Sequence, residues 1–395
     1  MNPPTDQLPF PPADDILAVA PRYRELQEHR PVAPVRAATG DPAWLVTRHD
    51  DVTALLGDER LGRSHPNPAR AAATSNSVLL GGPVGDHDTE PDRHHRMRRL
   101  LGPAFSARRM NALRPRIGYL VDDLIDRLPA PPADWHRAFS VPLPVMVICE
   151  LLGVPYHDHP RLRRWSAALA SLTEPARARG ARDELTEYVR GLLPHKRDAP
   201  GEDVLSDLVA AQDEHGLTDD AVARTVAMLL FAGHETTVVR LDLGLLLLLT
   251  QPGHLGAIRA DATLVPGAVE EILRLSSLTT AGGLPRYART DITVGAVTIP
   301  AGDAILLAPH AANRDRRAFA DPDTFDPTRT PNPHLSFGHG THYCIGAGLA
   351  RAELQEAFSR IPARLPGLEL AVARDELRWH GDRLTGGLAE LPVTW

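Results

Sequence analysis

One long helix is the clearest prediction from the pattern of apolar and polar positions. The apolar pattern runs to Leu249, and Thr218 at its start has the hydroxyl of a typical N-cap residue. The aspartates at 219–220 fall in the first turn, where the positive end of the helix dipole favours acidic side chains. Pro252 and Gly253 end the pattern. At 1.5 Å per residue the helix would be about 48 Å long, enough to cross a whole domain.

Most of the chain between residues 90 and 275 has helical periodicity. Within it, Pro266 occupies the first turn of a helix that includes Glu271 and Arg274. The chain has no obvious linker and no internal repeat, so we predict a single domain over residues 1–395 with a proline-rich arm near its start. The fold class is mainly α with a small β-rich part. The strand-like runs are Trp44–Thr47, Ile292–Val294, Val297–Ile299 and Ala304–Ala308.

Composition places the chain among ordinary globular proteins, with 395 residues, 43% hydrophobic and 24% charged. The longest apolar run, Leu243–Leu249, is much shorter than the roughly 18 residues of a membrane span. The proline-rich start lacks the basic and apolar regions of a secretory signal. We therefore expect a cytoplasmic protein with no membrane partner. The net charge of −7 gives no general reason to expect a nucleic-acid partner.

A glycine-rich segment surrounds one of the two cysteines, Cys344. Glycines at 338, 340, 346 and 348 remove Cβ atoms where the backbone would approach a flat ligand, and a helix beginning after Cys344 would stabilise its thiolate. This pattern favours a metal ligand over a catalytic thiol. An inert buried cysteine in a turn of small residues stays equally open at this point. The histidine groups at 94–95 and 157–159 lack an evident third ligand, so a zinc site is not favoured.

Two polar residues interrupt the apolar middle of the long helix, Glu235 and Thr236. Helix propensity gives no reason for this pair, and Gly233 just before it would let the helix loosen locally and admit water. The alternative is an exposed acid beside a threonine that bonds to its own helix.

Four motifs together resemble the cytochrome P450 family, and they extend over most of the chain. Phe337–Gly346, FGHGTHYCIG, is similar to the haem-ligand loop FGxGxHxCxG at every fixed position. Ala232–Thr237, AGHETT, resembles the oxygen-activating segment, and Glu271–Arg274, EILR, resembles the ExxR pair. Ala311–Asp315 and Phe325–Arg329 are similar to the family's meander. The resemblance implies a triangular, mostly helical fold, with haem between the long helix and the cysteine loop.

The resemblance also implies a cofactor and its binding residues. Cys344 would be the axial thiolate of haem b, iron protoporphyrin IX, held noncovalently because no CxxCH sequence is present. Phe337 would shield the sulfur, and Gly346 belongs to the same loop motif. The residues implied for the two propionates are His94 and Arg98 on one helical face, Arg286 and His342.

Catalytic and structural roles follow from the same resemblance. Thr236 would form a hydrogen bond with the iron-bound oxygen, and Glu235 would relay protons from solvent to the distal oxygen. Glu271, Arg274 and Arg329 would form a buried structural ion-pair network.

Two segments are candidates for the substrate pocket. Ala232 and Met228 lie one and two turns before Thr236, with Phe231 beside them. Gly282, Gly283 and Leu284 would form another wall, in which the two glycines indicate either room for a bulky substrate or simply a flexible loop.

A local excess of positive charge indicates a docking site for an acidic electron donor. Eight arginines and no acidic residue lie between Arg93 and Arg116. We expect an acidic ferredoxin to dock there, and no recognition motif supports nucleic acid instead. Since the chain contains no flavin motif or iron–sulfur cysteine set, the electrons would come from NAD(P)H through a ferredoxin reductase and a ferredoxin.

The function implied is that of a monomeric haem-thiolate monooxygenase, which inserts one atom of O₂ into a C–H or C=C bond. Its substrate would be a bulky, largely apolar macrolide, other polyketide or terpenoid. One alternative is a peroxide-driven peroxygenase, although such relatives usually replace the Glu235–Thr236 pair with Arg-Pro. A catalytically silent haem-fold accessory protein is the other alternative, and the intact Cys344 disfavours it.

Overall fold

The computed structural model describes residues 6–251, 253–276 and 282–395. Their contacts group into two units, each assembled from separate segments of the chain. Unit 1 consists of Met1–Arg96, Glu270–Cys344 and Gly381–Gly386, and unit 2 of Met97–Val269, Ile345–His380 and Gly387–Trp395. The sequence pattern suggested a single domain and contained no sign of this interleaved division.

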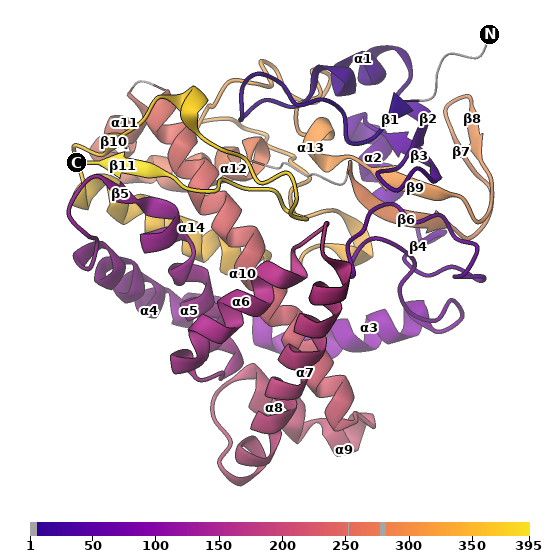
Figure 1. The fold of residues 1–395 in the computed structure, drawn as a ribbon, viewed down its shortest axis with the longest axis horizontal. Coiled ribbons are helices and arrows are strands. Elements are labelled where there is room, and N and C mark those ends of the chain that lie inside the picture. Colours follow the sequence, from indigo (N-terminus) through magenta and orange to yellow (C-terminus); the bar gives the residue numbers. More distant parts are fainter. Residues whose placement is uncertain (1–5, 252, 277–281) are drawn as a thin grey trace. The chain divides into compact units, whose positions relative to one another are not determined.

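Unit 2 is a helical bundle around α10 (Asp219–Thr250), the long helix predicted from the apolar pattern (Figure 1). The Thr218 hydroxyl accepts a hydrogen bond of 3.1 Å from the backbone N–H of Ala221, as expected of an N-cap. Helices α5, α6, α7, α8, α11 and α14 pack against α10. Besides α10, the helices of unit 2 are α4 (Ala107–Asp126), α5 (Pro142–Leu152), α6 (His159–Leu169), α7 (Pro175–Asp198), α8 (Val204–Ala210), α9 (Gln212–His215), α11 (His254–Ala260) and α14 (Ala347–Arg364).

Helix α10 is continuous through Gly233, so the local opening expected there is absent. The glycine instead permits close helix packing, because a Cβ at this position would lie 2.8 Å from Cδ1 of Ile148 on α5. A small antiparallel sheet completes unit 2, in the order β10 (Glu369–Leu370), β11 (Pro392–Thr394) and β5 (Ala133–Asp134).

Unit 1 is built on a six-stranded mixed sheet in the order β1-β2-β3-β9-β6-β4. Strands β3 and β9 are parallel, with Trp44 opposite Ile305, and β6 runs antiparallel to β9, with Arg286 also opposite Ile305. The strands are β1 (Asp6–Gln7), β2 (Val32–Arg36), β3 (Pro42–Val46), β4 (Leu61–Gly62), β6 (Leu284–Ala288) and β9 (Ala304–Leu307), besides the hairpin of β7 (Ile292–Val294) and β8 (Val297–Ile299).

Three short helices, α1 (Pro21–His29), α2 (His49–Leu56) and α13 (Pro309–Ala312), belong to unit 1. Two further helices cross from one unit to the other, namely α3 (Glu90–Leu101) and α12 (Val265–Leu275). The mainly helical class with a small β-rich part is therefore confirmed. Among the described residues, no single helix is both long and apolar enough to span a membrane.

Candidate functional site

The cysteine loop is a tight backbone turn. Gly338 and Gly340 have φ angles of 72° and 69°, values that side chains other than glycine rarely adopt. A Cβ on Gly340 would also lie 2.7 Å from Cα of Gly57. The loop closes through a 2.9 Å hydrogen bond from the Cys344 N–H to the Phe337 carbonyl.

The two cysteines have opposite environments. Cys344 is exposed, and α14 begins at Ala347, three residues further along the chain. Gly346 is the N-cap residue of that helix. Cys149 is buried in α5, where burial raises the pKa of its thiol to about 12. Of the two, only Cys344 is placed to bind a ligand.

Three residues predicted to hold the propionates gather in unit 1. The rings of His94 and His342 lie 4.0 Å apart, measured between their centroids. Burial lowers the pKa of His342 to about 3, with further lowering by the nearby charges of Arg286 and His94. Burial also lowers the pKa of Arg286 to about 10. A pocket of about 170 Å³ opens beside the two histidines.

Two residues that sequence reasoning missed complete this cluster, Arg63 and Glu90. Arg63 is half-buried, desolvation lowers its pKa, and its charge acts on both Arg286 and His342. Glu90 is the carboxylate at the centre of the cluster, but it already accepts hydrogen bonds from Arg289 (2.8 Å) and from the backbone N–H groups of Arg63 and Ser64 (2.8 and 3.0 Å). Glu90 lies one turn before His94 on α3, a spacing that the sequence could have indicated.

The cluster fits a ligand with two carboxylates. Within the described ranges, neither Arg286, which is buried, nor Arg63, which is half-buried, forms an ion pair. Buried charges need partners, and the two propionates of haem would supply them. Arg98 lies one turn after His94 on α3 and is half-buried.

Glu271, Arg274 and Arg329 meet in a buried network within unit 1. The Arg274 Nε and Nη2 atoms each lie 2.7 Å from an oxygen of Glu271, and both side chains are fully buried. The Arg329 Nε donates to the same carboxylate at 3.2 Å. Arg274 also donates to the Asn313 carbonyl at 3.0 Å, which fixes α12 to the segment after α13.

An exposed stripe interrupts the buried surface of α10 in unit 2. Met228, Ala232 and Thr236 are exposed at intervals of one helical turn, and Met228 is 40% exposed. The Thr236 hydroxyl donates to the Ala232 carbonyl at 2.9 Å, and Glu235 beside it is buried. These three residues lie on one face of α10, as their spacing in the sequence predicted. Glu235 is buried, so it is not the exposed acid of the alternative interpretation.

Phe231 does not belong to this stripe. Its side chain is 6% exposed and lines a small internal cavity with Val145 of α5, Leu162 of α6 and Leu185 of α7. The expectation that Phe231 lies beside Met228 and Ala232 in the pocket was wrong, because its position on α10 turns it toward the neighbouring helices.

Packing explains the two glycines before β6. Gly282 has a φ of 81°, and a Cβ there would lie 2.8 Å from Cδ1 of Leu8. A Cβ on Gly283 would collide with the Leu307 carbonyl group of β9, 2.9 Å from its carbon atom. Leu284, the first residue of β6, is half-buried. Close packing against Leu8 and β9 therefore gives a reason for both glycines other than room for a ligand.

No group of three potential metal-binding side chains occurs in the part of the chain that the structure describes.

Comparison with known proteins connects these features to one family. The family described as Cytochrome P450 matches residues 176–362. Pentalenolactone synthase from Streptomyces exfoliatus is 45% identical, covering 99% of this chain and 100% of that protein. Mycinamicin IV hydroxylase/epoxidase from Micromonospora griseorubida is 41% identical, with 97% and 98% covered.

Solved structures agree. The X-ray structure of PimD, a polyene macrolide antibiotic pimaricin epoxidase, has a TM-score of 0.88 and 40% identity, and 100% of both chains is covered. The cysteine loop, the cation cluster and the near-complete coverage lead to one conclusion: the chain belongs to the cytochrome P450 family and is a haem b monooxygenase that uses O₂ and electrons from external redox partners.

Proposed function

We propose that this enzyme hydroxylates or epoxidises a bulky, largely apolar secondary metabolite of the macrolide, other polyketide or terpenoid class. The observation that carries the proposal is the exposed stripe of Met228, Ala232 and Thr236, two small or apolar side chains beside one hydroxyl, in the middle of a mostly buried helix. Similar proteins include pentalenolactone synthase and a mycinamicin IV hydroxylase/epoxidase. Such a surface suits an apolar substrate with few polar groups.

The haem group would be held by residues of the cysteine loop and the cation cluster. Cys344 would bind the iron, Phe337 would exclude water from its sulfur, and Gly346 would let the backbone come close. When bound, the haem supplies the activation of O₂ for insertion of one oxygen atom into the substrate. The propionates would be bound by His94, Arg98, Arg286 and His342.

Proton delivery would depend on Glu235 and Thr236. Glu235 would relay protons from solvent, and its buried side chain lies next to the exposed Thr236 on α10. The Thr236 hydroxyl points its proton at the Ala232 carbonyl and keeps its lone pairs available. Thr236 can therefore accept a hydrogen bond from water and present its oxygen on the exposed stripe.

An acidic ferredoxin, reduced through an NAD(P)H-dependent ferredoxin reductase, would dock on the segment Arg93–Arg116. Three of its eight arginines already form ion pairs within unit 2, Arg109 with Asp207, Arg114 with Glu356 and Arg116 with Glu150. Arg93, Arg96, Arg99 and Arg108 are exposed, and they would carry most of the attraction. We further propose that the enzyme acts as a cytoplasmic monomer.

The visible spectrum tests the haem-binding role of Cys344. The dithionite-reduced protein should show a strongly red-shifted Soret band on addition of carbon monoxide. This band should vanish in Cys344→Ala and persist in Cys149→Ala, which removes the buried thiol instead. A persistent band in Cys344→Ala would contradict the assignment.

A panel of macrolides, linear polyketides and terpenoids would then test the substrate class. A bound substrate should shift the haem spin state and change the visible spectrum, and turnover should yield a product heavier by one oxygen atom. A response only to small polar compounds would refute the proposed class.

A further inference from the structure

The His234 side chain lies on the side of α10 that faces neighbouring helices, directly before Glu235 and Thr236 in the sequence. It is 5% exposed and lines the same small internal cavity as Phe231, together with residues of α5, α6 and α7. Successive residues of a helix turn by about 100°, so the ring points about 200° away from the Thr236 hydroxyl. His234 therefore does not belong to the exposed stripe, and any influence on the stripe must pass through α10 itself.

Both ring nitrogens of His234 are hydrogen-bonded to other elements of unit 2. Nε2 lies 3.2 Å from the carbonyl oxygen of Val141, the residue before α5, and Nδ1 lies 3.0 Å from the hydroxyl of Ser166 on α6. Because a carbonyl oxygen only accepts, Nε2 donates to it, and in the neutral ring Nδ1 then accepts from the Ser166 hydroxyl. Ser166 is 4% exposed, so bulk water does not compete for this bond. One ring thus connects α10 to the start of α5 and to α6.

The residue before His234 is held as well. A Cβ at Gly233 would lie 2.8 Å from Cδ1 of Ile148, so α5 and α10 are in close contact at this turn. Packing fixes Gly233, and two hydrogen bonds fix His234. The next two residues are the buried Glu235 and the exposed Thr236. Contacts that fix the rotation of α10 about its axis at this turn therefore also fix which of these two side chains is exposed.

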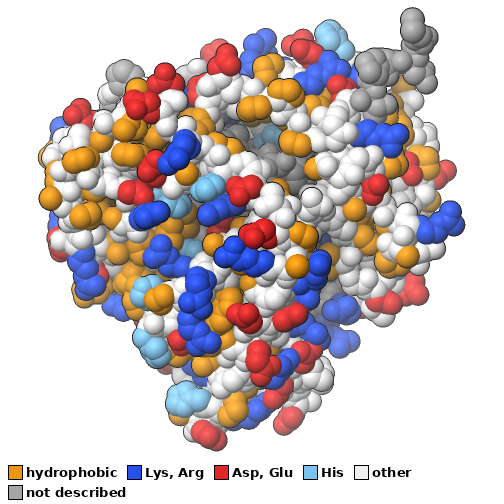
Figure 2. All heavy atoms as spheres, viewed as in Figure 1, with side chains coloured by type: hydrophobic (Ala, Val, Ile, Leu, Met, Phe, Trp, Pro, Cys, Tyr) orange, Lys and Arg blue, Asp and Glu red, His pale blue; other side chains and the backbone are white. Residues whose placement is uncertain are grey.

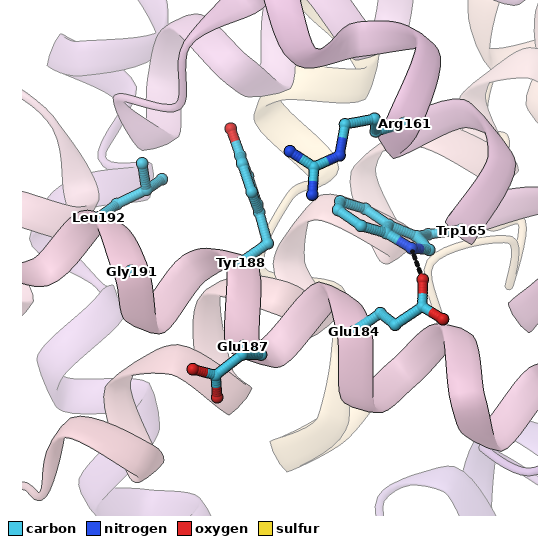
Figure 3. Close-up of a pocket in the computed structure, with 7 residues that line it drawn as sticks. All are labelled: Arg161, Trp165, Glu184, Glu187, Tyr188, Gly191 and Leu192. Atoms are coloured by element: carbon cyan, nitrogen blue, oxygen red, sulfur yellow. Dashed lines mark hydrogen bonds between the residues drawn. The ribbon is translucent and has the colours of Figure 1, made fainter.

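Helix α6 is held on another side by α7. Trp165, beside Ser166, lines a pocket between the two helices and donates a 2.7 Å hydrogen bond from Nε1 to Glu184 of α7 (Figure 3). The rings of Trp165 and Tyr188 contact each other, with centroids 5.4 Å apart, and Arg161 packs over both rings. The outer surface adds no extended field of one sign, since Figure 2 shows basic and acidic side chains intermixed on the face that carries α6 and α7. Ser166 therefore projects from a helix that its contacts with α7 already hold.

We propose that His234 is a positioning residue for the oxygenation reaction. Its hydrogen bonds to Ser166 and Val141 hold α10 in one rotation about its axis. That rotation exposes Thr236 and buries Glu235, and the inference rests on the proton delivery proposed for those two residues. Without the bonds, this turn of α10 fluctuates, proton delivery is less controlled, and more electrons from NAD(P)H end in hydrogen peroxide or water. Substrate binding changes little, because the His234 ring lies outside the stripe.

Ser166→Ala and His234→Phe test the bonds in the purified holoenzyme. The substrate is the compound of the macrolide, polyketide and terpenoid panel that shifts the haem spin state. In Ser166→Ala, the ratio of product formed to NAD(P)H oxidised should fall by about two- to fivefold, since one hydrogen bond is lost. His234→Phe should lower this ratio further, and adding Ser166→Ala to it should have no additional effect, because the two residues share one bond. The substrate concentration that gives half of the spin-state shift should stay unchanged.

Amide hydrogen exchange provides a measurement that needs no substrate. Loss of the bonds should speed exchange in the α10 backbone over residues 232–237 and leave α7 unchanged. Trp165→Phe is the matched control, because it breaks the neighbouring bond of α6 to Glu184 and keeps Ser166 and His234. It should alter neither the exchange of α10 nor the coupling ratio. His234→Gln keeps an uncharged donor and acceptor, so it should recover most of the coupling that His234→Phe loses.

Wild-type coupling in a haem-replete His234→Phe protein would overturn the inference. If that variant loses haem, Ser166→Ala decides, and wild-type coupling there has the same meaning. Equal losses in His234→Gln and His234→Phe would also overturn it, because the shape of the ring would then matter and its hydrogen bonds would not. Thr236→Ala separates this inference from the proposed function. Poor coupling in Thr236→Ala with normal coupling in His234→Phe removes only the positioning role, whereas normal coupling in both contradicts the proposed proton delivery as well.

Discussion

Thr236 and Thr237 are consecutive residues of α10 with the same hydrogen bond and opposite exposure. The Thr236 hydroxyl donates to the Ala232 carbonyl at 2.9 Å, and the Thr237 hydroxyl donates to the Gly233 carbonyl at 3.2 Å. Thr237 is 4% exposed, whereas Thr236 belongs to the exposed stripe. The Thr236 hydroxyl can therefore contact substrate and water, whereas the Thr237 hydroxyl bonds only within the helix.

Thr236→Ala should bind substrate normally but couple electron consumption to product poorly, because the exposed hydroxyl that directs protons is lost. We expect the ratio of product formed to NAD(P)H oxidised to fall several-fold, with hydrogen peroxide or water formed instead. Thr237→Ala is the matched control and should keep the wild-type ratio. Equal coupling in Thr236→Ala and the wild type would refute the role of this hydroxyl.

Glu271→Ala should prevent stable incorporation of haem. It leaves the fully buried Arg274 without its carboxylate, and breaking a buried ion pair costs about 3–5 kcal/mol. The haem content of the purified protein and the denaturant midpoint measure the effect. Glu270→Ala changes the neighbouring carboxylate, which is 27% exposed and pairs with His334, and should be far milder. A folded Glu271→Ala protein with full haem content would contradict the structural role.

The sequence predicted those features of the fold that depend on local pattern. The long helix, the β7–β8 hairpin and the contact between Glu271 and Arg274 are all set by residues close together in the chain. Arg63 was missed because it approaches Arg286 only through folding of distant segments, and no local pattern marks it. Phe231 was misplaced because one residue of offset on a helix turns a side chain by about 100°.

Gly283→Ala should destabilise the protein by about 1–3 kcal/mol, since the new methyl group would overpack against β9. Gly180→Ala offers a contrast, because that glycine is exposed in α7 with nothing within 4 Å of a Cβ. There we expect a stabilisation of about 0.5–1 kcal/mol from helix propensity. Urea denaturation of both variants provides the comparison, and a neutral Gly283→Ala would show that β9 can yield at this point.

Arg108→Glu should raise the concentration of ferredoxin needed for half-maximal reduction several-fold at low ionic strength. Arg108 is exposed, so reversing its charge acts on the approach of an acidic partner. The difference should shrink as salt is added, because screening shortens the range of surface charges. Arg182→Glu, an exposed position on α7, serves as the control for net charge. Identical responses of the two variants would show that ferredoxin docks elsewhere.

His310 in α13 should make the protein sensitive to acid. Among the described residues, neither buried ring nitrogen has a hydrogen-bond partner. The ring packs edge-on against Tyr23, with 4.5 Å between ring centroids, and burial lowers the pKa of His310 to about 3. The unfolded chain takes up this proton near pH 6.5. Stability is therefore lost as the pH falls from about 6.5 toward 3, since the unfolded state binds the additional proton first.

His310→Phe should remove that loss. The free energy of unfolding of the variant minus that of the wild type should be about 2 kcal/mol larger at pH 5 than at pH 8. Urea denaturation at the two pH values measures this difference directly, and any effect of the altered ring volume cancels. The same gain at both pH values would mean that the pKa of His310 is the same in the folded and the unfolded protein.

The interleaving of the two units affects how the protein can be dissected. The chain passes between them after Arg96, Val269, Cys344, His380 and Gly386. The first three crossings fall beside His94, Glu271 and the cysteine loop, so no continuous fragment consists of one whole unit and nothing else. A chain shortened at any of these crossings would therefore carry residues of both units, so cutting the protein at one point cannot isolate either of them.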